Sequence, residues 1–184
     1  MAMIQEAVLG LLAREPSHGY ALWQTLQGWS VDETIQSSSV YMAIKRLADA
    51  EAIEVVALGP APRHGERPRH TFAITAAGRD RLDRWLSQRP ATVEDLRLRI
   101  AIAQPADDLS VLIDWVNQAL VDTQRRLGAA PAAAVEETAS WDSACALAMS
   151  TLSFHELSAR AQWLAEANAQ LRRLHELATA NRGA

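Results

Sequence analysis

Cysteine, lysine and long apolar runs are nearly absent from this sequence. Its 184 residues include one cysteine, Cys145, and only Lys45 among the 18 basic residues is a lysine. A single cysteine excludes an intrachain disulfide framework and a zinc site built from several thiolates, and it is typical of a reducing cytosol. No apolar run approaches the roughly 20 residues of a membrane span, and residues 1–6 lack the basic start of a signal peptide. We therefore expect a cytoplasmic protein with no membrane contact.

The sequence also lacks recognisable catalytic and metal-binding motifs. Its five histidines do not cluster at ligand spacing, and neither His-Glu-Leu tripeptide, at 155–157 or 175–177, continues to a second histidine four positions on. No nucleophile elbow, phosphate loop or dinucleotide fingerprint is present. We expect no enzyme activity, no cofactor and no metal, with His18 packing against or capping a helix. Cys145 lies in an alanine-rich helical run and is expected to be buried and inert.

The charge of the chain is unevenly distributed. The whole chain carries a net charge of −4, with 49% hydrophobic and 22% charged residues, as in a soluble globular protein. Residues 63–89, however, carry seven arginines against three acidic residues. A local basic surface of this kind is sufficient for phosphate contact, whatever the total charge. The alternative is a solvated helix face of mixed charge.

The patterns before Pro90 describe three short helices, a two-stranded hairpin and a fourth helix. Apolar spacings of three and four predict the helices, and Ser37–Ser39 is a good N-terminal cap for the third. A tip rich in proline and glycine separates the two strands. This order describes a winged helix-turn-helix. The predicted helices cover 4–12, 18–29, 39–47 and the residues after Thr75, and the predicted strands cover 52–58 and 69–74.

The third helix carries the argument for DNA. On a wheel of about 100° per residue, Val40 and its apolar neighbours face inward, and short side chains at the N-terminus of the opposite face would permit close entry into the major groove. Lys45 and Arg46 can reach phosphates or guanine edges, and the Tyr41 hydroxyl suits a phosphate. The alternative is a solvated helix beside a mobile loop. The predicted DNA-binding residues are Ser38, Ser39, Tyr41, Met42, Lys45 and Arg46, with Arg63, Arg67 and Arg69 supporting from the hairpin.

Three segments stand out together: His18-Gly19-Tyr20, Ser39 to Leu47 running on to Glu54, and Arg67 to Phe72 leading to Arg79. In order and spacing they resemble the PadR family of bacterial transcriptional regulators. The resemblance covers about residues 4–88, and the length is similar to that of the longer subgroup, which adds an all-helical C-terminal dimerisation domain. It implies a homodimeric repressor that is released from operator DNA by a small effector or by stress.

Two positions depart from the family pattern. Met42 stands where the family usually has proline after the tyrosine of the third helix, and Thr71-Phe72 stands where the wing often has tyrosine. We interpret both as changes of operator preference and not as a loss of DNA binding.

After Pro90 every pattern is helical, so the predicted fold of the whole chain is mainly α. We expect a DNA-binding domain at 1–90 and a helical dimerisation domain at 91–184. Two series of residues spaced by seven and offset by three form an a/d seam near the C-terminus. We expect this seam to pack on a second subunit, with Asn168 fixing the register; the alternatives are burial against the chain's own helices and a solvent-facing Asn168. The predicted interface residues are Phe154, Leu157, Ala161, Leu164, Asn168, Leu171 and His175.

Six tryptophans against two phenylalanines and two tyrosines raise the question of an effector. A buried indole needs a partner for its N–H group, so tryptophan is a demanding choice for a plain core. We expect Trp115 and Trp163 to line a pocket for a small planar or aromatic effector; ordinary packing is the alternative.

The predicted function is a PadR-like repressor of double-stranded operator DNA. The alternative is a winged-helix protein-interaction adaptor without specific DNA binding, whose acidic C-terminal half is the working surface.

Overall fold

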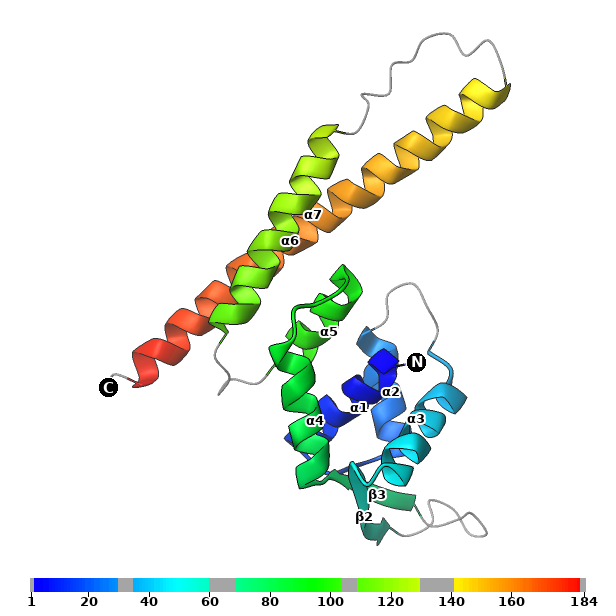
Figure 1. Ribbon diagram of the computed structural model, residues 1–184, viewed down its shortest axis with the longest axis vertical. Helices are drawn as coiled ribbons and strands as arrows, with labels where there is room; N and C mark the ends of the chain where they lie inside the picture. The colour runs from blue at the N-terminus through cyan, green and yellow to red at the C-terminus, as the bar shows by residue number, and fades with distance from the viewer. Residues whose placement is uncertain (1, 30–34, 60–68, 104–108, 130–140, 183–184) are drawn as a thin grey trace. The chain divides into compact units, whose positions relative to one another are not determined.

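The computed structural model describes residues 2–29, 35–59, 69–103, 109–129 and 141–182 (Figure 1). The chain is mainly helical and has the predicted architecture, a winged helix-turn-helix followed by an all-helical region. The first unit contains α1 (Ala2–Arg14), β1 (Ser17–His18), α2 (Gly19–Trp29), α3 (Ser37–Asp49), β2 (Ile53–Gly59), β3 (Arg69–Ile74), α4 (Ala76–Ser87) and α5 (Val93–Ile102). The second contains α6 (Ser110–Ala129) and α7 (Trp141–Arg182). No described helix is long and apolar enough to cross a membrane.

The division between the two compact units falls between Gln104 and Pro105, whereas the sequence patterns place it near Pro90. It falls later because α5 packs on α1 and so belongs to the first unit. The two helices approach so closely that a Cβ on Gly10 would lie 2.8 Å from the side chain of Ile102.

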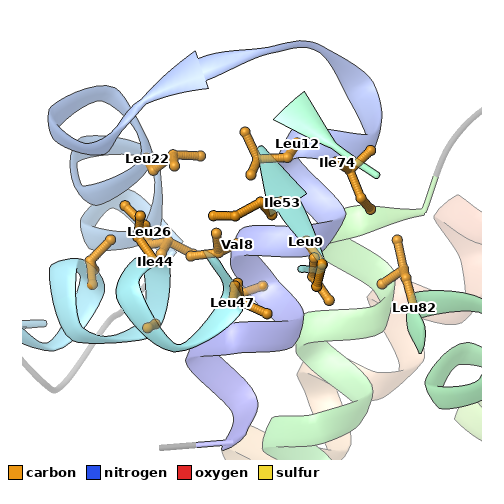
Figure 2. Packing of buried hydrophobic residues seen from close by; sticks show 14 of the residues in the cluster. Val8, Leu9, Leu12, Leu22, Leu26, Ile44, Leu47, Ile53, Ile74 and Leu82 are labelled. Atoms are coloured by element: carbon orange, nitrogen blue, oxygen red, sulfur yellow. The ribbon is translucent and has the colours of Figure 1, made fainter. Parts of the chain in front are cut away.

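The core of the first unit is built around α1. Helices α2, α3, α4 and α5 and strand β3 all contact α1. Val8 and Leu9 are completely buried as a result. Leu9 lies outside the apolar series with spacings of three and four, which consists of Ile4, Ala7, Val8, Leu11 and Leu12. Figure 2 shows their side chains meeting residues of α2, α3, α4 and both hairpin strands. Burial of these side chains is the main force that fixes the position of α3.

The sheet has three antiparallel strands in the order β1-β3-β2. Strands β2 and β3 form the predicted hairpin, with an irregular register between Val55 and Ala57. The short strand β1, which the sequence patterns do not predict, pairs Ser17 with Phe72 and His18 with Thr71. Two residues are too few to show the alternation that identifies a strand. His18 also caps α2, as expected, because its Nδ1 accepts a hydrogen bond of 3.0 Å from the Ala21 N–H.

The junction between α3, the hairpin and α4 is tightly closed. Thr75 caps α4: its Oγ1 accepts a 3.1 Å hydrogen bond from the Gly78 N–H and donates one of 2.7 Å to the Glu51 carbonyl. A Cβ on Gly78 would lie 2.1 Å from the Ala52 carbonyl oxygen, so only glycine permits this approach. Glu51 lies two residues after the end of α3 and has a positive φ of 55°.

A buried arginine joins α4 to α5. Arg99 is 1% exposed, and its Nε donates a 3.1 Å hydrogen bond to Oδ1 of Asp95. Its Nη1 donates to the carbonyls of Trp85 and Leu86 at the end of α4, and its guanidinium carbon lies 4.0 Å from the centroid of the Trp85 ring. The guanidinium thus satisfies carbonyls that the end of a helix leaves without an intrahelical partner.

In the second unit, α6 and α7 pack together and run antiparallel (Figure 1). The middle of the predicted seam is buried within one chain: Leu164 is 0%, Leu171 4% and Asn168 8% exposed. The Asn168 side chain donates a hydrogen bond to Oδ1 of Asn117 on α6. Asn168 is therefore not solvent-facing, and its partner lies on the neighbouring helix of the same chain.

Candidate nucleic-acid interface

Helix α3 has the two faces that the sequence predicts. Its Val40, Ala43, Ile44 and Leu47 side chains are all buried, at 4% exposure or less. Of the six predicted DNA-binding residues of α3, Ser39 is half-buried and the others are exposed. Tyr41 is 50% and Met42 47% exposed. The inner face anchors the helix, and the outer face is exposed apart from the half-buried Ser39.

The N-terminus of α3 differs from the prediction in one detail. The capping residue is Gln36, whose carbonyl accepts a 3.0 Å hydrogen bond from the Ser39 N–H and whose side chain makes no capping hydrogen bond. Ser37–Ser39 instead forms the first helical turn. These short side chains leave the backbone N–H groups of that turn near the helix surface, where an anionic phosphate would be favourable.

Tyr41 is held against the start of α2. Its ring lies so close to Gly19 that a Cβ there would be 2.6 Å from the Tyr41 Cε1 atom. Gly19 is buried directly after His18, which caps the same helix. The His18-Gly19 pair therefore shapes the surface on which the Tyr41 ring rests.

The chain that leads into α3 is fixed by a tryptophan. Trp23 of α2 donates a 2.7 Å hydrogen bond from its indole N–H to the carbonyl of Ile35, two residues before the helix begins. Together with the buried inner face, this bond sets the direction of α3 relative to α2.

The hairpin carries only part of the predicted basic surface within the described residues. Arg63 and Arg67 lie outside the described residues, and Arg69 is the first residue of β3. His70 follows it and is exposed, with its ring 6.4 Å from that of Phe72.

Further arginines lie on α4. Arg79 and Arg84 are exposed. Arg81 instead forms an ion pair of 2.6 Å with Glu6 of α1, which is 8% exposed. Arg81 therefore connects α4 to α1, and Arg79 and Arg84 remain as the exposed part of the basic stretch on this helix.

The predicted effector residues lie on adjacent helices. Trp115 on α6 and Trp163 on α7 are both half-buried. Cys145 is exposed, contrary to the prediction that it is buried, because it lies on a part of α7 whose described side chains are mostly exposed. Among the described residues, no three His, Cys, Asp or Glu side chains gather closely enough to hold a metal ion.

A family comparison matches most of the first unit. Residues 8–84 match the model of the transcriptional regulator PadR-like family. This part of the chain is similar to the PadR-like family of transcriptional regulators. The match begins in α1 and ends in α4, so it contains α3, the hairpin and the His18-Gly19-Tyr20 segment. No curated protein matches the chain at a significant level.

Solved structures of regulators resemble this chain at low identity. Bacillus subtilis PadR in complex with operator DNA is 19% identical over 91% of this chain and 98% of that chain, with a TM-score of 0.42. The same protein with p-coumaric acid is 19% identical over 92% and 96%, with a TM-score of 0.37. The Vibrio cholerae virulence activator AphA is 17% identical over 93% and 99%, with a TM-score of 0.38. Scores this low establish nothing about what this chain binds.

Sequence reasoning missed the contact that supports the interface from behind. Gly19 was noticed as part of a motif, but its packing against Tyr41 depends on how α2 crosses α3. The small residue after His18 was the available signal, because glycine often marks a close approach of another group to the backbone.

Proposed function

We propose that this chain is a PadR-like homodimeric transcriptional repressor that binds operator DNA through the outer face of α3. The observation that carries the proposal is the division of α3 into a fully buried face and an exposed face with Tyr41, Met42 and Lys45. A helix anchored on one side and polar on the other can enter the major groove without disturbing the core.

The contacts divide into two kinds. Lys45, Arg46 and the Tyr41 hydroxyl grip phosphates or guanine edges, and Ser38, Ser39 and Met42 face the bases. The wing arginines Arg63, Arg67 and Arg69 follow the adjacent backbone. In a dimer, the two copies of α3 would meet half-sites about one helical turn apart.

Dimerisation is assigned to α7. Helix α6 already buries Leu164, Asn168 and Leu171 within one chain, which leaves the outer part of the predicted seam for a second subunit. Because Asn117 faces Asn168, an antiparallel α6 ends opposite about residue 156 of α7. Before that point Phe154 is 46%, Leu152 52% and Met149 63% exposed, and these apolar side chains favour association with a second copy.

Release by an effector is assigned to the helical unit. Half-buried Trp115 and Trp163, on helices that pack together, offer flat apolar surfaces to a planar aromatic compound. p-Coumaric acid is a suitable first probe. Binding would quench tryptophan emission and weaken DNA binding, and Trp115→Phe and Trp163→Phe would reduce both effects. No quenching and no loss of DNA binding would leave a regulator without this type of effector.

The test of DNA binding is fluorescence anisotropy of the full-length protein with labelled DNA from directly upstream of its own gene. Unrelated DNA of equal length is the control, and both are measured at two salt concentrations. Preferential binding of the upstream DNA by two subunits per site supports an autoregulated repressor. Equal weak binding to both would place the operator elsewhere.

The second candidate function is a protein-interaction adaptor. The observation that favours it is the acidic balance of residues 90–184, with 8 basic and 12 acidic residues, which is unfavourable near phosphates. An adaptor would bind neither DNA even at low salt. That result would discard the repressor and make the helical unit the working surface.

A further inference from the structure

Met42 is an apolar side chain in the middle of a polar surface. It lies one helical turn after Ser38 and one turn before Lys45, both exposed, so the three residues form one outward stripe of α3. The Met42 side chain is 47% exposed. The buried face of the helix is filled by Val40 and Ile44, and Met42 points away from it.

The chemistry of the thioether limits what Met42 can recognise. Methionine has no hydrogen-bond donor, and its sulfur is only a weak acceptor. In the major groove, guanine, adenine and cytosine are distinguished by hydrogen-bonding groups, and only thymine presents a methyl group. An apolar side chain that faces base edges therefore gains most from the 5-methyl group of thymine.

The position of Met42 near the N-terminal end of α3 favours contact with base edges. Ser38 and Ser39 precede it with short side chains, so Met42 is the first long side chain of the stripe from the N-terminal end of the helix. Residues near that end commonly contact base edges when a recognition helix enters the groove. Lys45, one turn later, carries the charge for the sugar-phosphate backbone.

We infer that Met42 is the specificity-determining residue of α3 and that it requires a thymine at the position it faces in each half-site. This inference rests on the proposed function, because it needs α3 in the major groove. It adds to that function the base that is read and the atom group by which it is read.

The experiment uses the full-length protein and duplex DNA in which single thymines are replaced by deoxyuridine. The parent duplex is first selected from a pool with about 20 random base pairs, enough for two half-sites one turn apart. Deoxyuridine keeps every hydrogen bond of thymine and removes only the methyl group. We expect one position in the half-site at which deoxyuridine weakens binding. Replacement in a single half-site should weaken it about three- to fivefold, the effect of losing one buried methyl group.

Variants of Met42 make the test specific. In Met42→Ala the same deoxyuridine should have no effect, and Met42→Gln, of similar length, should shift the preference towards adenine. Met3→Ala is the matched control, since Met3 is 39% exposed and lies on α1. It should retain the full response to deoxyuridine.

The possible failures are distinguishable. Two results overturn the inference about Met42 but leave DNA binding intact. In the first, the protein selects a sequence, but replacing thymine by deoxyuridine weakens binding at no position. In the second, the replacement weakens binding by Met42→Ala as much as binding by the wild-type protein. If the wild-type protein selects no sequence from the pool, the proposed function itself fails, and the role of Met42 fails with it.

Discussion

The ring of Tyr41 rests on Gly19, with its Cε1 atom 2.6 Å from where a Cβ of residue 19 would be. An alanine at residue 19 must therefore displace the exposed ring of Tyr41, together with a smaller shift of Ile44, which would be 3.2 Å away. The position of the Tyr41 hydroxyl thus depends on the absence of a side chain in another helix.

Gly19→Ala should weaken DNA binding by moving the Tyr41 hydroxyl away from its phosphate. In a Tyr41→Ala background the same change should cost little further, because the two residues act through one contact. Anisotropy titrations of the four proteins measure this coupling. Gly28→Ala is the control, since no atom lies within 4 Å of a Cβ there. Independent, additive losses would show that Gly19 does not act through Tyr41.

Gly78→Ala should destabilise the first unit by about 2 kcal/mol or more, because the new Cβ would lie 2.1 Å from the Ala52 carbonyl and backbone must move. Urea denaturation followed by circular dichroism measures the change. Gly128→Ala on α6 has open space and should be neutral or stabilising, by up to about 1 kcal/mol. Equal stability of wild type and Gly78→Ala would contradict the packing of α4 on the α3–β2 turn.

Arg99→Ala should destabilise the protein by about 3–5 kcal/mol, because it leaves Asp95 buried without its charged partner and frees two carbonyls at the end of α4. Arg125→Ala is the matched control. Arg125 pairs with Asp122 at a similar 3.1 Å, but its side chain is 72% exposed, so we expect a change within about 0.5 kcal/mol. Chemical denaturation of both variants should separate them clearly; similar small losses would argue against the buried arrangement.

Phe154→Glu should shift the protein from dimer to monomer, because a charge would replace an exposed apolar ring on the part of α7 beyond α6. Light scattering after size exclusion, over a range of concentrations, gives the mass. Val121→Glu on α6, where Val121 is 48% exposed, controls for the added charge. A dimer that persists in Phe154→Glu would place the interface elsewhere.

The buried face of α3 could be predicted because a helix packed on one side repeats its apolar residues every three to four positions. The burial of α1 could not be predicted in full. Leu9 lies off the periodic face and is buried because α1 is packed on several sides. Arg99 and Asp95 are also spaced like an ordinary surface pair, and only the position of α4 makes them part of the interior.

The seam on α7 shows a second limit. A heptad pattern predicts that a stripe is covered but does not identify the covering helix. Leu164, Asn168 and Leu171 are buried within one chain, with Asn168 bonded to Asn117 of α6, whereas Phe154 remains exposed. The same pattern therefore describes both an internal contact and a surface that is open to a partner.

The central claim, that α3 grips DNA phosphates through its outer face, is tested most directly by the salt dependence of DNA binding. The logarithm of the association constant falls linearly with the logarithm of the salt concentration. We predict that Lys45→Ala makes this slope less steep by about 0.9, the value for one lost phosphate contact. Arg126→Ala, which removes one positive charge from an exposed position on α6, should leave the slope unchanged. A wild-type slope in Lys45→Ala, or equal slope changes in both variants, would contradict the placement of α3 on the DNA.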